Sequence, residues 1–215
     1  LQAARTLKAT GIDIETTELS RLVDELRNIE KEQYHKELSG YGSLTDAELD
    51  TVVVTEQYRR EIAFAPSYML NEFVRTGMRE NISTYAETAS VMTDEIKRAQ
   101  SSYEQLMTTP RKDMGDSITK AFRNIDALLE NSNIDVTNEN RRVVKILAHN
   151  QIEITESNVN MMKDYDARIE KLLENLKPQT TLEIIRQGIN PLEIPLEELE
   201  RHVEIINNGS FENED

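Results

Sequence analysis

The clearest pair of residues whose types and spacing suit metal-binding chemistry is Glu32 and His35. A Glu-x-x-His spacing places both side chains on one face of a helix, as in bundles that bind two metal ions through carboxylates. Such a bundle needs a second copy of the motif and two further inward-facing Glu side chains, and the sequence has no second copy. We therefore expect no metal site and no cofactor, and we keep a carboxylate-based, metal-dependent enzyme around Glu32 and His35 as an alternative.

Other catalytic arrangements are also missing from the sequence. The chain contains no Cys, which excludes thiol nucleophiles, zinc–thiolate sites and disulfides. The Gly-x-Gly-x-x-Gly, Walker and Gly-x-Ser-x-Gly motifs do not occur. The 40 Asp and Glu residues offer too many pairings to single out the two carboxylates of a glycosidase. The sequence therefore predicts a protein that is not an enzyme and has no catalytic residues.

The charge balance restricts the class of partner. Among 215 residues, 40 Asp and Glu outnumber 25 Lys and Arg, which gives a net charge of −15. Nucleic-acid binding depends on Lys and Arg that neutralise phosphates, so we expect a protein partner and no nucleic acid.

The distribution of apolar residues bears on location. The apolar runs are too short to span a membrane, and no apolar segment typical of a signal peptide is present. We therefore expect a cytoplasmic protein without membrane contact. Because the chain begins with Leu1 rather than Met, we interpret it as a piece of a longer protein, so that a signal could lie upstream.

Helical periodicity dominates the sequence, and only seven Gly and five Pro are available for tight turns. Sandwiches, barrels and phosphate-binding loops need more such residues. The sequence predicts an all-α fold of eight or nine helices in a repeat-like arrangement of helix–connector–helix units. The expected helices cover residues 15–38, 46–63, 67–76, 83–107, 116–130, 137–149, 155–177, 180–187 and 195–206.

The clearest helix start is the run from Leu44 to Leu49. Thr45 is placed to accept a hydrogen bond from the first-turn amides, and the Glu48 side chain can reach back to the amide of Thr45. Leu44 can pack on Leu49 as a hydrophobic staple. These features predict a capping box at the start of a long helix.

One joint between helices recurs three times. It consists of a Leu, four further residues, two β-branched residues separated by one position, and then Thr or Glu; its copies begin at Leu7, Leu129 and Leu147. The Leu ends the apolar face of one helix, the β-branched residues form a connector, and the last residue caps the next helix. We interpret this pattern as a structural repeat, and ordinary amphipathic coincidence is the alternative.

Two stretches are candidates for a binding surface. Aromatic residues concentrate around Pro66, beside Arg59 and Arg60, and aromatic and Arg side chains are enriched at interfaces; we nevertheless favour a core position for the rings. Three basic residues share one predicted helix after position 140, and we favour internal pairing with carboxylates over an acidic partner. The candidate interaction residues are Tyr58, Arg59, Tyr68, Phe73, Arg141, Arg142 and Lys145.

The helix after the last joint carries an apolar seam with alternating steps of three and four residues, as in coiled coils. Its members are Val159, Met162, Ile169, Leu173 and Leu176. Asp166 interrupts the seam and would set its register at a cost in stability. The seam predicts a possible homo-oligomer.

The chain divides most naturally near Pro110, where polar residues and Gly115 follow a long helix. We expect a helical half over 1–107, a hinge over 108–115, a second helical half over 116–206 and a disordered acidic tail over 207–215. The two halves could also form one domain. The tail prediction depends on eight acidic residues against one Arg from Glu193 onward.

A resemblance covers the region from Leu106 to Glu200. It is carried by the segments Leu106–Ser117, Lys120–Asn124, Asn140–Arg142, Ile152–Thr155 and Ile185–Glu193. The region resembles a domain family of unknown function in large repeat-containing proteins of clostridia and related gut Firmicutes. The resemblance implies a bacterial source and a longer parent chain, and it brings no activity or residue roles. We therefore predict a non-catalytic interaction or scaffold module of a larger bacterial protein, with a flagellum-associated structural component as a further alternative.

Overall fold

The computed structural model describes residues 19–105 and 125–210, and within them the fold is all-α, as predicted. The described part contains nine α-helices and two 3₁₀ helices, and its single β-bridge lies outside any strand. The elements are α2 (Leu19–Glu37), η1 (Ser39–Tyr41), α3 (Asp46–Ala63), η2 (Ser67–Met69), α4 (Leu70–Thr76), α5 (Ile82–Gln105), α7 (Ile125–Asn131), α8 (Asn138–His149), α9 (Glu156–Asn175), α10 (Pro178–Arg186) and α11 (Leu196–Ser210). None of the described helices is long and apolar enough to cross a membrane.

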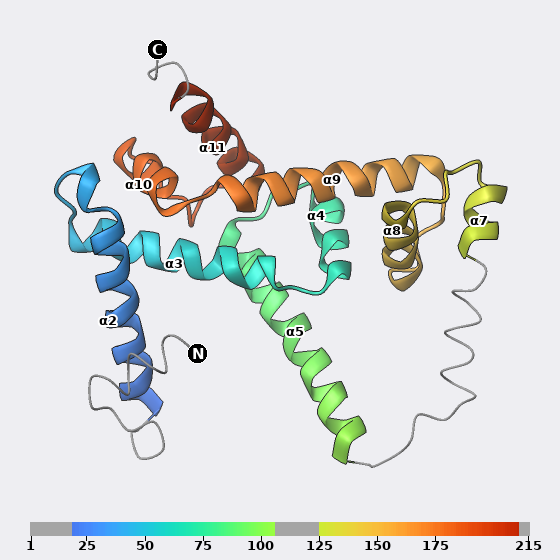
Figure 1. The fold of residues 1–215 in the computed structure, drawn as a ribbon, viewed down its shortest axis with the longest axis horizontal. Coiled ribbons are helices and arrows are strands. Elements are labelled where there is room, and N and C mark those ends of the chain that lie inside the picture. Colours follow the sequence, from blue (N-terminus) through green and yellow to red (C-terminus); the bar gives the residue numbers. More distant parts are fainter. Residues whose placement is uncertain (1–18, 106–124, 211–215) are drawn as a thin grey trace.

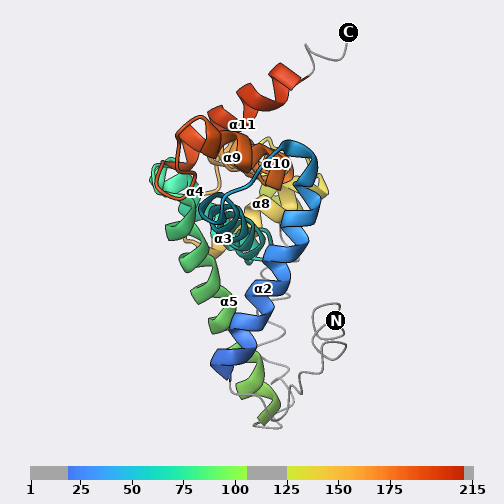
Figure 2. The same cartoon turned by 90° about the vertical axis from the view of Figure 1, so that its left-hand side faces the viewer.

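Helices α3 and α9 cross the middle of the molecule one above the other, and α4 lies against α9 (Figure 1). Helix α10 packs against α3, and α11 packs against both α9 and α10. Helices α2 and α5 both contact α3 and extend away from α9, which is also visible after a quarter turn (Figure 2). The α3–α4–α9 region is therefore the central part of the described fold.

The predicted capping box is confirmed at the start of α3. The Thr45 side chain accepts from the Glu48 amide at 3.2 Å, and the Thr45 amide donates to the Glu48 carboxylate at 2.7 Å. Leu44 and Leu49 belong to the same apolar cluster, as expected for a staple. Val52 and Val53 are buried in a continuous helix, because burial outweighs the weak helix propensity of β-branched residues.

The two joints within the described residues share one geometry. The amides of Ile134 and Ile152 each donate to the carbonyl of the joint's leucine at 2.9 Å, and the residue before each Ile has a positive φ. Thr137 and Thr155 each cap the following helix. The local pattern is therefore confirmed at these two places, whereas a repeat-like arrangement of the whole helices stays a prediction. The copy that begins at Leu7 lies outside the described residues.

Several helix boundaries differ from those predicted; α9, for example, ends at Asn175 rather than at 177. Helix α10 starts at Pro178 rather than at 180, because proline lacks the amide N–H that would stay unpaired in a first turn. Helix α11 continues to Ser210, three residues past Asn207, where the tail was expected to begin. The predicted hinge over 108–115, the helix start expected at 116 and the tail residues 211–215 lie outside the described residues.

The two predicted halves share a hydrophobic core. Ile62 and Phe73 from the first half belong to the same buried cluster as Leu147, Met162 and Leu199 from the second. A smaller cluster joins α2, α3 and α10 through Tyr34, Val52 and Leu182.

The loop between α2 and α3 is held from the far end of the chain. The Arg186 guanidinium on α10 donates to the carbonyl oxygens of Tyr41 at 2.6 Å and Ser43 at 2.9 Å. These contacts span 145 and 143 residues of sequence.

Candidate functional site

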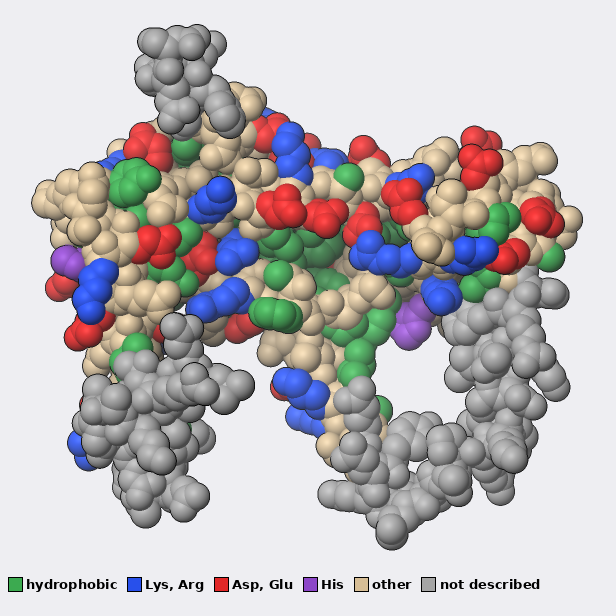
Figure 3. Space-filling view, viewed as in Figure 1, with side chains coloured by type: hydrophobic (Ala, Val, Ile, Leu, Met, Phe, Trp, Pro, Cys, Tyr) green, Lys and Arg blue, Asp and Glu red, His purple; other side chains and the backbone are tan. Residues whose placement is uncertain are grey.

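A groove lies between the end of α3, helix α4 and the middle of α9. Its volume is about 330 Å³. Apolar side chains from all three elements line it, and most of them are buried: Ile62, Met69, Leu70, Phe73, Ile169 and Leu173. Figure 3 shows hydrophobic side chains open to this face between α9 and α3, with acidic side chains along α9. We call this cavity the α3–α9 groove.

Local backbone signals shape the groove. Ala65 precedes Pro66, a position that disfavours the α conformation, so α3 ends at Ala63 and the chain turns back into η2 and α4. Gly77 ends α4 with a φ of 63°, a conformation that glycine adopts without strain. The turn brings Met69, Leu70 and Phe73 toward α9 and forms the back of the groove.

The α9 side of the groove carries three carboxylates. Asp166, Glu170 and Glu174 are four residues apart and therefore lie on one face of the helix, beside Ile169 and Leu173. Asp166 accepts two hydrogen bonds from the Arg142 guanidinium, at 2.5 and 3.1 Å. Glu170 and Glu174 are exposed and have no ion-pair partner among the described residues. The interruption of the seam at Asp166 is thus explained by its position on the rim of the groove.

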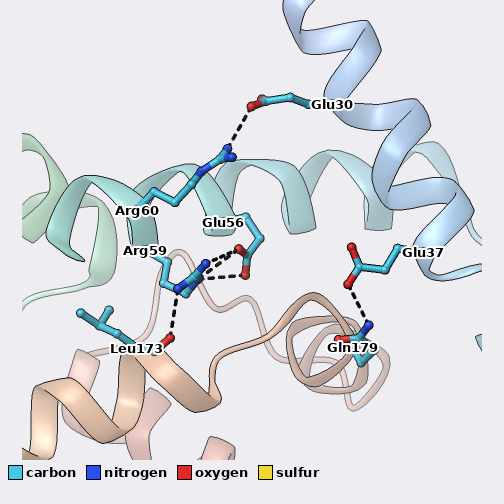
Figure 4. A network of polar contacts seen from close by, with 7 residues as sticks. All are labelled: Glu30, Glu37, Glu56, Arg59, Arg60, Leu173 and Gln179. Carbon is cyan, nitrogen blue, oxygen red and sulfur yellow. Dashed lines mark hydrogen bonds and ion pairs between the residues drawn. The ribbon is translucent and has the colours of Figure 1, made fainter. Parts of the chain in front are cut away.

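The α3 side is bounded by a buried ion pair. The Arg59 guanidinium contacts the Glu56 carboxylate at 3.0 Å and donates to the Leu173 carbonyl at 3.2 Å (Figure 4). That carbonyl belongs to the last turn of α9, where carbonyls lack amide partners within the helix. Arg59 therefore links α3 to the C-terminal end of α9.

Two further contacts in Figure 4 tie the surrounding helices together. Arg60 on α3 pairs with Glu30 on α2 at 3.0 Å, and Gln179 on α10 donates to Glu37 on α2 at 2.9 Å. The Glu56–Arg59 pair thus lies within a polar network that joins α2, α3, α9 and α10.

Burial raises the pKa of the Glu56 carboxyl, and the hydrogen bonds and positive charge of Arg59 offset this effect only in part. The Glu56 side chain is almost fully enclosed, since the residue is only 2 % exposed. Because its pKa is higher in the folded than in the unfolded chain, Glu56 stabilises the fold below pH 4.5 and loses this contribution as the pH rises through its folded pKa.

We therefore expect Glu56→Gln to have a pH-dependent effect on stability. The free energy of unfolding of the wild type, minus that of the variant, should increase as the pH falls from neutral to 4.5. Urea unfolding across this range measures the difference. Glu183→Gln, an exposed substitution on α10, is the control for loss of a carboxylate charge. A pH-independent difference for Glu56→Gln would contradict the expectation.

The predicted interaction residues do not form one surface. Arg59, Phe73 and Arg142 line the α3–α9 groove, whereas Tyr58, Tyr68, Arg141 and Lys145 lie outside its lining. Arg141 pairs with Asp126 at 2.7 Å, so the internal pairing favoured for Arg141 and Arg142 is confirmed. The core position favoured for the rings is confirmed for Phe73, which contacts Tyr85 with ring centroids 4.5 Å apart. Tyr68 is half-buried and stacks on His149 at 4.4 Å.

Most of the predicted oligomer seam is already packed within the chain. Val159, Met162, Ile169 and Leu176 are buried, and α9 contacts α4, α8 and α11. An oligomer formed through these residues would have to replace existing contacts. Leu173 is the seam member that stays half-exposed, and it lines the groove.

Glu32 and His35 are both exposed on α2. Within the described ranges, no three His, Asp or Glu side chains are placed so that they could hold a metal ion together. The alternative of a metal-dependent enzyme thus gains no support from the described residues.

A model described as a family of unknown function (DUF6240) matches residues 1–215, so the chain belongs to this family. The match extends beyond the region from Leu106 to Glu200 that the resemblance covered. No curated protein and no solved structure shows significant similarity to the chain.

Proposed function

We propose that this member of a family of unknown function is a non-catalytic protein-binding module, and that its α3–α9 groove binds a basic amphipathic helix of a partner protein. The observation that carries the proposal is the combination of a groove with an apolar lining and a rim on which the charges without an ion-pair partner, among the described residues, are acidic. Grooves of this kind bind helices that insert apolar side chains at positions three and four residues apart.

The basic side chains on the rim are already paired within the chain, which favours this function over the binding of a small polar ligand. Small-molecule sites direct a few polar groups toward the ligand, whereas the guanidinium groups of Arg59 and Arg142 are each held by a carboxylate of the same chain. Glu56, the buried acid beside the groove, is likewise held by Arg59. Binding through the apolar floor leaves these pairs intact, which supports a macromolecular rather than a catalytic role.

Charge complementarity selects a basic partner. The chain has a net charge of −15. The rim residues Glu170 and Glu174, which have no ion-pair partner among the described residues, add local negative charge where a ligand would enter. Complementary charges increase the association rate and suppress partners of like charge. An amphipathic helix with Lys or Arg on its polar face meets both requirements, since its apolar face covers the floor.

The proposal retains three expectations from the sequence. The parent protein is a large repeat-containing protein of clostridia or related Firmicutes, the module works in the cytoplasm, and its role is to hold other proteins. The resemblance of the region from Leu106 to Glu200 supports the first of these.

The proposal is tested with defined peptides. A Leu–Lys amphipathic peptide of about 18 residues, or five helical turns, should bind saturably in a calorimetric titration, and its Leu–Glu counterpart should bind at least about tenfold more weakly at low salt. Ala63→Arg introduces a large cation at an exposed position in the lining and should abolish binding. Ala99→Arg, the same exchange at an exposed position on α5, is the matched control and should bind like the wild type.

Three outcomes would contradict the proposal. The first is an absence of saturable binding. The second is equal loss of affinity in Ala63→Arg and Ala99→Arg, which would indicate non-specific attraction to an acidic protein. The third is saturable turnover of a small substrate by the purified protein, which would overturn the non-catalytic part.

A further inference from the structure

We infer that the partner helix of the α3–α9 groove is recognised by two basic residues four positions apart, which pair with Glu170 and Glu174. This inference rests on the proposed function and specifies the partner that the groove selects. It follows from which rim charges are free, how they are spaced and which apolar side chains lie beside them.

The spacing follows from the geometry of α9. Glu170 and Glu174 are separated by about one helical turn, or roughly 6 Å along the axis at 1.5 Å per residue. Both line the groove next to Ile169 and Leu173. A partner helix that lies along α9 places residues i and i+4 at the same separation. Two Lys or Arg at these positions can thus meet the two carboxylates at once, while neighbouring apolar side chains enter the groove.

The partner helix needs two basic residues rather than three, because the third carboxylate on the rim is already paired. Asp166 lies one turn before Glu170, but the Arg142 guanidinium already donates two hydrogen bonds to it. A third basic residue in register would meet this pair and gain little. Recognition therefore uses two basic residues rather than a continuous basic stripe.

The α3 side of the groove does not favour a partner that binds through an acidic residue. Arg59 is bound to Glu56 and to the Leu173 carbonyl, so it has no free charge for an acidic residue of the partner. Within the part of the chain that the structure describes, the lining charges without an ion-pair partner are Glu170 and Glu174 on α9. The partner is therefore held by its basic residues along α9 and by apolar contacts elsewhere in the groove.

The test compares two peptides of identical composition. Both carry the same apolar face, but one has its two Lys four residues apart along the edge facing α9, and the other has them on opposite edges. Each exposed ion pair is expected to contribute about a two- to fivefold gain in affinity. The second peptide keeps one Lys on the edge facing α9 and loses one ion pair, so the first peptide should bind roughly two- to fivefold more tightly at low salt.

Matched variants identify the carboxylates. Glu170→Gln and Glu174→Gln should each weaken the binding of the first peptide about two- to fivefold. The double variant should bind both peptides equally. Asp164→Asn removes one charge from an exposed position on α9 that does not line the groove and should preserve the preference. A third Lys in register should change the affinity less than about twofold, because Asp166 is paired.

The outcomes separate this inference from the proposal beneath it. Equal binding of both peptides that Ala63→Arg still abolishes would overturn the two-residue rule and leave the groove as the binding site. An absence of binding by either peptide would overturn both. A preference that persists in the double variant would overturn the assignment to Glu170 and Glu174.

Discussion

Replacing Phe73 by alanine is expected to lower the free energy of unfolding by about 3–5 kcal/mol, the range for removal of a large aromatic side chain from a core. Phe73 is 2 % exposed, its ring contacts that of Tyr85, and it belongs to the cluster that joins the two halves of the chain. Substitution removes both the burial of the ring and its contacts, since the surrounding helices can close the cavity only in part. Urea unfolding of the purified variant measures the loss.

Phe64 provides a matched control for this prediction. It lies in the same aromatic stretch, nine residues earlier, but it is 81 % exposed. Phe64→Ala should change the free energy of unfolding by no more than about 0.5 kcal/mol, as for most surface substitutions. Similar losses for the two variants would show that Phe73 is not part of the stabilising core.

Replacing Arg59 by alanine is expected to cost about 3 kcal/mol, the lower end of the range for breaking a buried ion pair. The variant leaves Glu56 enclosed without its partner and frees the Leu173 carbonyl at the end of α9. The lower end applies because the Arg59 side chain keeps 28 % of its surface exposed. Urea unfolding at neutral pH measures the loss, and the far-ultraviolet circular dichroism spectrum reports whether the helices persist.

Two variants serve as controls for Arg59→Ala. Arg60→Ala removes the neighbouring guanidinium, whose pair with Glu30 is more than a third exposed on both sides, and should cost less than about 1 kcal/mol. The double variant Glu56→Leu/Arg59→Leu removes both charges and should recover most of the stability, because no unpaired buried charge is left. Equal losses for Arg59→Ala and Arg60→Ala would contradict a special role for the buried pair.

The helices could be predicted from local signals alone. Thr45 with Glu48, Pro66, Gly77 and the two described joints each act within a few residues, so the sequence near them determines where a helix begins or ends. The same reasoning missed the first residue of α10, because Pro178 both ends one segment and begins the next.

The groove could not be predicted in the same way, because α9 forms one wall and lies about a hundred residues after α3 and α4, which form the others. Ile62, Glu170 and Glu174 follow ordinary amphipathic patterns and carry no local mark of their shared site. The one available signal was Asp166, an acid within an apolar seam, and the structure assigns it to the rim beside Arg142. Internal pairing of the basic residues could be favoured from composition, whereas the identity of each partner depends on the packing of distant helices.

The contacts from Arg186 to the loop after α2 can form only late during the synthesis of this protein. After the ribosome has added Tyr41, it must add 145 further residues before the Arg186 guanidinium that binds the Tyr41 carbonyl exists. At about 5–20 residues per second, this delay lasts roughly 7–30 s. Leu38, Val52 and Val53 wait for a similar time until Leu182, which completes their cluster, has been added. Nascent chains should therefore present this apolar hairpin to chaperones until α10 has left the exit tunnel.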